Sequence, residues 1–148
     1  MFRGISAVNI DAKGRFALPA RYRDKSDKNF VVTIDTEVAC LLIYPLVAWE
    51  KIEEKLQALP SFNRAARRIQ RLLIGHATEI ELDDAGRFLL PKVLRDYAGL
   101  TKKAVLIGQG TKFELWDEAT WETHRGELLD EATGEGAELP EELGSISL

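Results

Sequence analysis

The chain has 148 residues, 45% of them hydrophobic and 30% charged, which is typical of a soluble globular protein that can bury a core. A single cysteine, Cys40, excludes an internal disulfide framework, and with only two histidines we expect no bound metal and no cofactor. The residues that open the chain do not form a signal peptide, and the longest apolar run, residues 38–49, is too short to span a bilayer, so we expect a cytoplasmic protein.

The formal net charge of -4 is unevenly distributed along the chain. Residues 114–148 contain eleven Asp or Glu and one Lys or Arg, whereas residues 1–113 contain nineteen basic and thirteen acidic side chains. The acidic character therefore belongs to the C-terminal segment, and the rest of the chain is basic enough to bind a polyanion.

The first elements are predicted to be two short strands joined by a turn. Residues 5–10 alternate loosely between apolar and polar side chains, and residues 15–18 form a second candidate strand. The intervening Asp-Ala-Lys-Gly segment, residues 11–14, has turn chemistry, because Asp11 can accept hydrogen bonds from nearby backbone amides and Gly14 tolerates a positive φ. This places Lys13 and Arg15 at a hairpin tip. Pro19 ends the strand, and residues 20–24 are expected to form a helical turn.

Two more strands, residues 30–34 and 41–44, are rich in β-branched and aromatic side chains. They precede two helices. Residues 46–59 carry an apolar stripe at helical spacing and stop before Pro60, and residues 62–74 can be capped by Ser61 and closed by Gly75.

The second predicted helix carries four arginines at positions i, i+3, i+4 and i+7, so that they share one face: Arg64, Arg67, Arg68 and Arg71. This face can be solvated, can pair with carboxylates of a neighbouring subunit, or can contact nucleic-acid phosphates. The sequence leaves these three roles open.

The second half of the chain repeats the pattern. Strands are predicted at residues 79–82, 88–90, 105–107 and 113–116, a short helix at 91–98 and a last helix at 120–129. Beyond residue 130 the chain is acidic and rich in glycine without a strong apolar stripe, so we expect a frayed or mobile tail.

The two halves share a motif. Residues 11–24 match residues 83–96 at eight of fourteen positions, and the same offset of 72, without a gap, sets Ile34 on Leu106 and Tyr44 on Trp116. This self-similarity indicates a duplicated unit. We expect a first repeat at residues 5–48, a helical connector at 49–76, a second repeat at 77–121 and an acidic helix with a tail at 122–148.

Each copy of the motif contains the spacing Asp-x-x-x-Arg, as Asp11 with Arg15 and Asp83 with Arg87. A nearby arginine favours the ionised carboxylate and makes it a poor general base, and no nucleophile with a base is evident, so we do not expect an enzyme. An arginine on a rigid turn can instead reach phosphates or the edge of guanine. The pairs can also simply lock their own turns, and both roles can hold together.

The two turns differ in charge. The first, Asp-Ala-Lys-Gly-Arg, carries two positive charges against one negative, and the second, Asp-Asp-Ala-Gly-Arg, carries one against two. A polyanion should therefore bind more strongly at the first turn. Five further basic residues of the N-terminal half are expected to add to this bias: Arg3, Arg21, Arg23, Lys25 and Lys28.

Three further segments accompany these motifs: the opening Met-Phe-Arg-Gly, Arg-Ile-Gln-Arg-Leu-Leu-Ile-Gly-His at residues 68–76, and Phe-Glu-Leu-Trp-Asp at residues 113–117. Together with the motifs, they closely resemble the MraZ family of bacterial transcriptional regulators. The resemblance implies an α+β fold of two tandem swapped-hairpin units of the AbrB type, with short strands forming a barrel-like body and peripheral helices.

The same resemblance implies a DNA-binding repressor of its own division and cell-wall gene cluster, associated with the nucleoid and acting on short direct repeats in double-stranded DNA. It also implies a homo-oligomeric ring of about eight subunits. By position, Arg15 and Arg87 are the motif arginines, Asp11 and Asp83 are their partners, and Lys13 fits the basic position of the first motif. With Arg3 added for its charge, we expect DNA to be bound by Lys13, Arg15, Arg87 and Arg3, and the turns to be shaped by Asp11, Gly14, Asp83 and Gly86. The alternative is a protein-interaction module, of the antitoxin kind, with the same fold.

Overall fold

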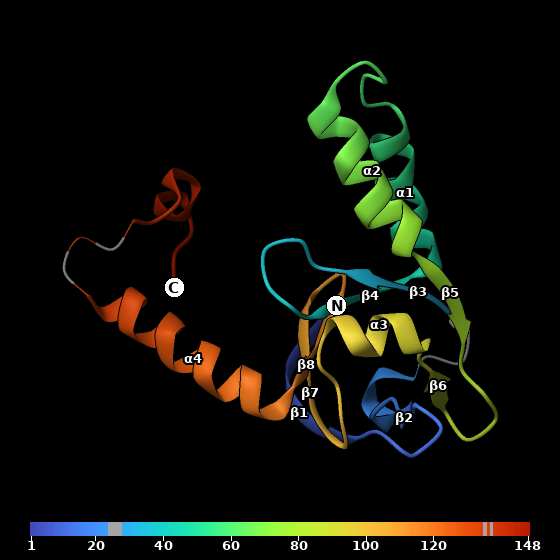
Figure 1. Ribbon diagram of the computed structural model, residues 1–148. Helices are drawn as coiled ribbons and strands as arrows, with labels where there is room; N and C mark the ends of the chain where they lie inside the picture. The colour runs from blue at the N-terminus through green and yellow to red at the C-terminus, as the bar shows by residue number, and fades with distance from the viewer. Residues whose placement is uncertain (24–27, 135, 137) are drawn as a thin grey trace. The chain divides into compact units, whose positions relative to one another are not determined.

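The computed structural model describes residues 1–23, 28–134, 136 and 138–148 and combines antiparallel strands with helices (Figure 1). The α+β class predicted from the sequence is confirmed. The chain divides into two compact units, Met1–Glu118 and Ala119–Leu148, which are described separately.

The first half of the larger unit contains β1 (Phe2–Asn9), β2 (Arg15–Ala17), a 3-10 turn (Ala20–Tyr22), β3 (Asn29–Ile34) and β4 (Leu41–Pro45). The second half repeats this order with β5 (Thr78–Glu81), β6 (Arg87–Leu89), α3 (Lys92–Tyr97), β7 (Lys103–Gly110) and β8 (Phe113–Asp117). The predicted elements therefore occur in the predicted order. Asp24, expected to end the first helical turn, lies outside the described residues.

The strands of the two halves are exchanged. Six of them form an antiparallel sheet in the order β1-β7-β8-β4-β3-β5, in which β1 pairs with β7 of the second half and β5 pairs with β3 of the first. The expected hairpin partner of β1 is wrong, because β2 pairs with β6 in a separate two-stranded ladder. The side chains of the sheet that point inward enter one core, to which both halves contribute.

The strand pairing also corrects the offset between the repeats. Leu41 and Phe113 are 72 positions apart, and they pair with Ile34 and Gly108, which are 74 apart. The gap-free match, which made Ile34 of β3 equivalent to Leu106 of β7, is therefore wrong, because the pairing makes Ile34 equivalent to Gly108. The second half has two extra residues before β7 and two fewer in the loop between β7 and β8, so the two changes cancel and the offset returns to 72.

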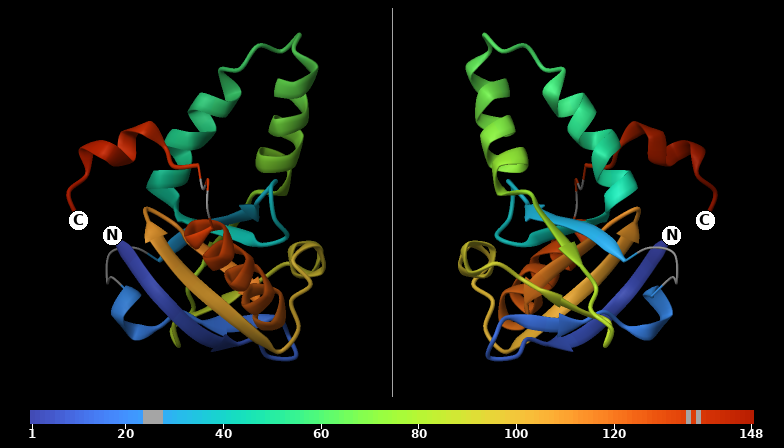
Figure 2. Two further views of the ribbon diagram at one scale, coloured as in Figure 1. Left: turned by 90° about the vertical axis from the view of Figure 1, so that its left-hand side faces the viewer. Right: turned by 90° about the vertical axis from the view of Figure 1, so that its right-hand side faces the viewer.

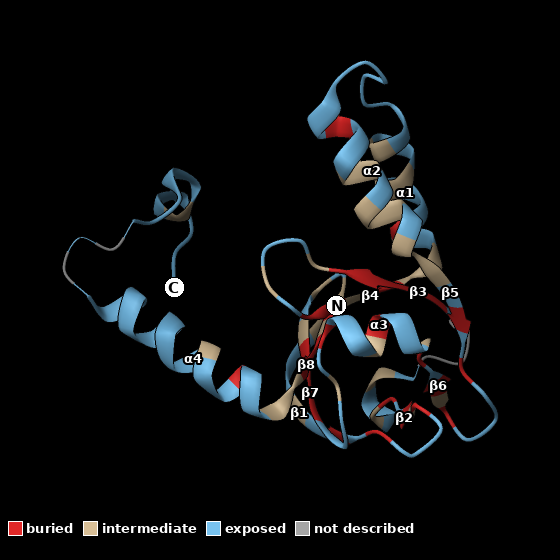
Figure 3. Cartoon of the chain, in the orientation of Figure 1, coloured by how far each residue is buried: buried red, intermediate tan, exposed pale blue. Residues whose placement is uncertain are grey.

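The core is built from aromatic and aliphatic side chains of both halves, shown as the buried segments of the strands in Figure 3. Phe16 of β2 and Phe88 of β6 are almost fully buried, with ring centroids 5.5 Å apart, and Phe30 of β3 stacks edge-on against Phe88 at 5.0 Å. Burying these rings anchors the short β2–β6 ladder, which three residue pairs alone would not stabilise.

Two helices, α1 (Leu46–Gln57) and α2 (Arg64–His76), connect the halves and pack beside each other as a helical hairpin that extends away from the sheet (Figure 2). Trp49 is buried at the base of α1, in a small cluster with Val31 and Tyr44. The predicted cap Ser61 is wrong: the side chain of Asn63 accepts the hydrogen bond from the Ala66 amide at 3.1 Å. Gly75 lies inside α2, which continues to His76.

The smaller unit contains most of α4 (Glu118–Thr133) and a 3-10 helix (Glu141–Ser145). The last helix is thus longer at both ends than the predicted 120–129, and part of the segment expected to be irregular is helical. Among the described residues, no helix combines the length and the apolar character needed to cross a membrane.

Candidate nucleic-acid interface

The first turn is held together by Asp11. One carboxylate oxygen accepts hydrogen bonds from the backbone amides of Lys13 at 3.0 Å and Arg15 at 2.8 Å, and the other accepts from Nε of Arg15 at 2.8 Å. The Asp11 and Arg15 backbones also bond to each other at 2.9 Å, which closes the turn. These bonds fix the direction in which the Arg15 side chain leaves the backbone.

The second turn repeats this geometry. Asp83 accepts from the amides of Ala85 at 2.9 Å and Arg87 at 2.8 Å, and from Nε of Arg87 at 3.0 Å. The pKa values of Asp11 and Asp83 are both lowered, chiefly by the backbone amides of Arg15 and Arg87. Both carboxylates are therefore ionised at neutral pH, and both arginines are positioned by them. Of the two uses that the sequence left open, locking the turn is confirmed.

Each glycine of the two turns has a positive φ, +89° at Gly14 and +73° at Gly86. Each is also covered by an arginine of the other half. A Cβ on Gly14 would lie 2.7 Å from the guanidinium carbon of Arg95, and one on Gly86 would lie 2.5 Å from that of Arg23. Glycine is thus favoured by the backbone conformation, and a side chain at either position would also displace the arginine packed against it.

The same two arginines hold the strands that follow the turns. Nε of Arg23 donates to the Leu18 carbonyl at 2.6 Å, and Nε of Arg95 donates to the Leu90 carbonyl at 3.1 Å. In addition, Leu18 donates its amide to the Gly86 carbonyl and Leu90 donates to the Gly14 carbonyl, both at 2.9 Å. Each turn is therefore also bonded to the other half of the chain.

The β2–β6 ladder brings Arg15 and Arg87 onto one surface. Arg15 pairs with Leu89 and Ala17 pairs with Arg87, while Phe16 and Phe88 between them point into the core. Because side chains alternate along a strand, the two arginines share the outer face of the ladder. They occupy diagonally opposite positions on the two strands, where Cα atoms are usually about 7–8 Å apart. Their side chains keep 29% and 38% of their exposure. Within the described residues, their terminal Nη atoms take part in no hydrogen bond.

Lysines from the opposite half flank each turn, which the sequence did not reveal. The Ile10 amide donates to the Lys102 carbonyl at 2.8 Å, and Asn9 pairs with Lys103, so two exposed lysines lie beside the first turn. The equivalent bond of the second turn joins the Leu82 amide to the Lys28 carbonyl at 2.9 Å. Strand exchange creates these neighbours, so only the register of the strands could have identified them.

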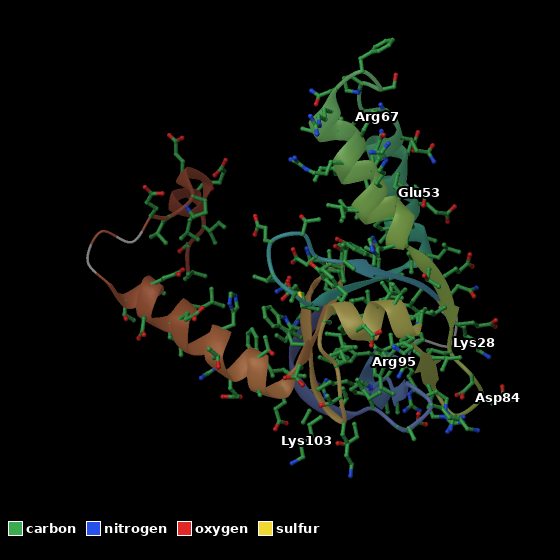
Figure 4. The ribbon with its side chains drawn as sticks, viewed as in Figure 1. Lys28, Glu53, Arg67, Asp84, Arg95 and Lys103 are labelled. Carbon is green, nitrogen blue, oxygen red and sulfur yellow. The ribbon has the colours of Figure 1, made fainter. Side chains whose placement is uncertain are left out.

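The charge difference between the turns is therefore larger in the structure than in the sequence. Lys13 is exposed on the first turn beside Lys102 and Lys103, whereas the second turn carries Asp84 and Ala85 and has one lysine of the other half beside it among the described residues, Lys28, which Figure 4 shows near Asp84. The expectation that Lys28 adds to the first turn is therefore wrong, because it belongs to the second.

Other basic residues predicted near the first turn lie elsewhere. Arg3 is at the opposite end of β1, about 20 Å from Asn9 at the usual rise per residue of a strand. Arg21 donates to the Ser6 hydroxyl and stacks over Tyr22, 4.5 Å from the ring centre. Arg23 packs on the second turn, and Lys25 lies outside the described residues.

One further cluster was not predicted. The ligand atoms of Asp35, Cys40 and Glu114 lie within 4.8 Å of one another. Burial, helped by the two carboxylates, raises the pKa of the Cys40 thiol, which donates to Asp35 at 3.8 Å. In this environment the thiol is held in its protonated form at neutral pH, which makes it a poor nucleophile.

Comparisons with known proteins agree with this geometry. The family model described as "MraZ protein, putative antitoxin-like" matches residues 1–72 and again residues 73–138. Proteins named transcriptional regulator MraZ from Coxiella burnetii, Legionella pneumophila and Alkalilimnicola ehrlichii are 58%, 57% and 55% identical, over the full length of both chains. On this evidence the chain belongs to the MraZ family.

Proposed function

We propose that this protein is a sequence-specific DNA-binding transcriptional regulator, as the names of its relatives suggest for the family. The observation that carries the proposal is the placement of Arg15 and Arg87 on one exposed face, each oriented by an aspartate. Their free Nη atoms can donate to phosphates or to the O6 and N7 atoms of guanine. Lys13, Lys102 and Lys103 add phosphate contacts at the first turn.

The proposal includes the assembly and the target implied by the family resemblance. The subunits form a ring of about eight, in which weak contacts from each subunit add through a raised effective concentration. The ring binds short direct repeats upstream of the division and cell-wall gene cluster and represses its own expression. It acts in the cytoplasm at the nucleoid, not as an enzyme.

We further propose that the duplicated core is closed like a barrel. The β2–β6 ladder contacts both β1 and β5, the two edges of the six-stranded sheet, so it can cover the backbone groups that an edge would expose. The functional parts are the repeats at residues 5–48 and 77–121, joined by residues 49–76 and followed by residues 122–148.

Selection of bound fragments from a random DNA pool, at two salt concentrations, tests the function. The wild type should enrich a short repeated motif, and the yield should fall steeply at the higher salt concentration because phosphate contacts release counterions. The Arg15→Ala variant should enrich the motif much less than the wild type does. If the wild type enriches none either, DNA recognition is refuted and the interaction-module alternative takes its place.

A further inference from the structure

The four arginines of α2 have no partner within the described structure. Arg64, Arg67, Arg68 and Arg71 are all exposed, and none of their guanidinium groups takes part in a hydrogen bond or an ion pair among the described residues. We call them the α2 arginine face. The motif arginines, in contrast, are fixed by carboxylates. Four exposed guanidinium groups on one face have the chemistry to bind carboxylates or phosphates.

The α2 arginine face is remote from the turns. Figure 4 shows Arg67 toward the far end of the helical hairpin and Asp84 at the opposite end of the same unit. The helix and β5 lie between the two positions. The α2 arginine face therefore does not extend the surface that carries Arg15 and Arg87, and a different ligand is expected there.

The start of α2 and the end of α4 each carry charges of the unfavourable sign for the helix dipole. Arg64 is the first residue of α2, whose first turn contains no acidic residue, although the positive end of the helix dipole lies there. Asp130 and Glu131 occupy the end of α4, whose last turn contains no basic residue, although the negative end of the dipole lies there. Each end is destabilised alone, and contact between the two ends would relieve both.

The shapes and apolar groups of the two surfaces also fit. A hollow of about 320 Å³ is lined by Arg64, Arg68, Arg71 and Leu72. A groove of about 600 Å³ is lined by Arg67 and Arg71 of the same face and includes Leu59 and Ile74 among its lining residues. On α4, Leu128 and Leu129 are 43% and 49% exposed, next to the carboxylates. An acidic helix end with two leucines matches a basic groove with an apolar floor.

We propose that the α2 arginine face binds the acidic C-terminal unit, residues 119–148, of a second copy of this chain, with the end of α4 against the start of α2. The two surfaces differ, so the contact is head-to-tail, and repeated contacts of this type close into a ring. This inference rests on the oligomer in the proposed function, and it assigns the subunit contact that builds it.

Charge reversal on each side tests the contact. In one variant, Arg64→Glu and Arg68→Glu reverse the α2 arginine face, and in another, Asp130→Lys and Glu131→Lys reverse the end of α4. Both pairs improve the match with the helix dipole, so each variant should fold at least as well as the wild type. Each alone should weaken assembly by about tenfold or more, measured by analytical ultracentrifugation without DNA.

Mixing the two variants is the decisive step. The reversed α2 face of one variant complements the reversed α4 end of the other, and their unchanged surfaces also complement each other. An equimolar mixture should therefore recover the wild-type assembly size. If it stays small, the contact is within one chain or absent, and the proposal is overturned.

The controls separate this inference from the DNA-binding proposal. Lys51→Glu with Lys55→Glu makes the same charge change on α1 and should leave assembly unaltered. The neutral pair Arg64→Gln and Arg68→Gln should weaken assembly less than charge reversal does. If reversal of the α2 arginine face abolishes DNA binding while assembly is unchanged, the face binds phosphates and the inference is wrong. A monomeric wild type would also overturn it, whatever the DNA measurements show.

Discussion

The two Asp-x-x-x-Arg turns are nearly identical in geometry and opposite in charge. In both, one carboxylate holds two backbone amides and an arginine Nε at 2.8–3.0 Å. Only the first has Lys13 and the exposed pair Lys102 and Lys103 beside it. The shared geometry belongs to the fold, which contains both turns. The difference in charge is the basis on which we propose that DNA binds more strongly at the first turn and that the second turn is chiefly structural.

Removing the two arginines should produce the largest difference between the turns. Arg15→Ala should weaken binding to the selected DNA by about 10- to 100-fold, the cost of losing one base or phosphate contact of about 1–3 kcal/mol. Arg87→Ala should cost less than about tenfold, because fewer cations surround it. Gel shifts at one fixed salt concentration measure both. Equal losses would show that the charge difference has no role.

The glycines should show the opposite result, a matched loss in both turns. Gly14→Val and Gly86→Val each force a β-branched residue to a positive φ and displace Arg95 or Arg23. Each should lower the free energy of unfolding by about 1–3 kcal/mol in urea titrations.

Gly75→Ala is the control for this pair, since Gly75 lies in α2, where an added Cβ would meet nothing within 4 Å. It should raise stability by up to about 1 kcal/mol. Tolerance of valine in only one turn would mean that the halves are not mutually dependent.

Adding a lysine to the second turn should strengthen DNA binding there, and removing the lysine of the first turn should weaken DNA binding at the first turn. Ala85→Lys places a cation at the position equivalent to Lys13, on an exposed residue whose amide bond to Asp83 does not involve its side chain. The slope of log affinity against log salt should steepen by about 0.9 for one added phosphate contact. Lys13→Ala should make the slope shallower by a similar amount. Unchanged slopes in both variants would place the phosphates away from these two positions.

The smallest effect should be a shared dependence on acid. The pKa values of Asp11 and Asp83 lie below the ordinary 3.8, so the folded chain binds fewer protons than the unfolded chain. The stabilisation is present above pH 3.8 and is lost as the pH falls through the lowered values. Unfolding in urea from about pH 6 to about pH 2 should reveal it. Asp11→Asn and Asp83→Asn should each flatten the curve equally, and a marked inequality would contradict the common geometry.

Local patterns predicted much of this fold. Gly14 with Asp11, and Gly86 with Asp83, predict the turns because their chemistry is contained within five residues. The order of the strands and helices could also be predicted from local patterns. The helix cap is different, because Ser61 and Asn63 are both capping residue types, and only the hydrogen bond to Ala66 decides between them.

Contacts between the halves could not be predicted in this way. Arg23 and Arg95 appear in the sequence only as a repeated position, yet each covers the glycine of the opposite turn. Lys102 lies 91 positions after Asp11 in the chain and reaches the first turn through strand pairing. Even the repeat offset misleads in β3 and β7, because two compensating length changes are invisible to an alignment without gaps.

The exchange of β1 has a consequence for synthesis on the ribosome. Phe2–Asn9 pairs with Lys103–Gly110, so the first strand to emerge must wait for about a hundred further residues, or about 5–20 s at ordinary rates of translation. During that interval its edge is open and its apolar residues are uncovered, while α1 and α2 already have their local partners. A nascent chain of this design is thus most exposed to aggregation and to chaperones just before its last strands are made.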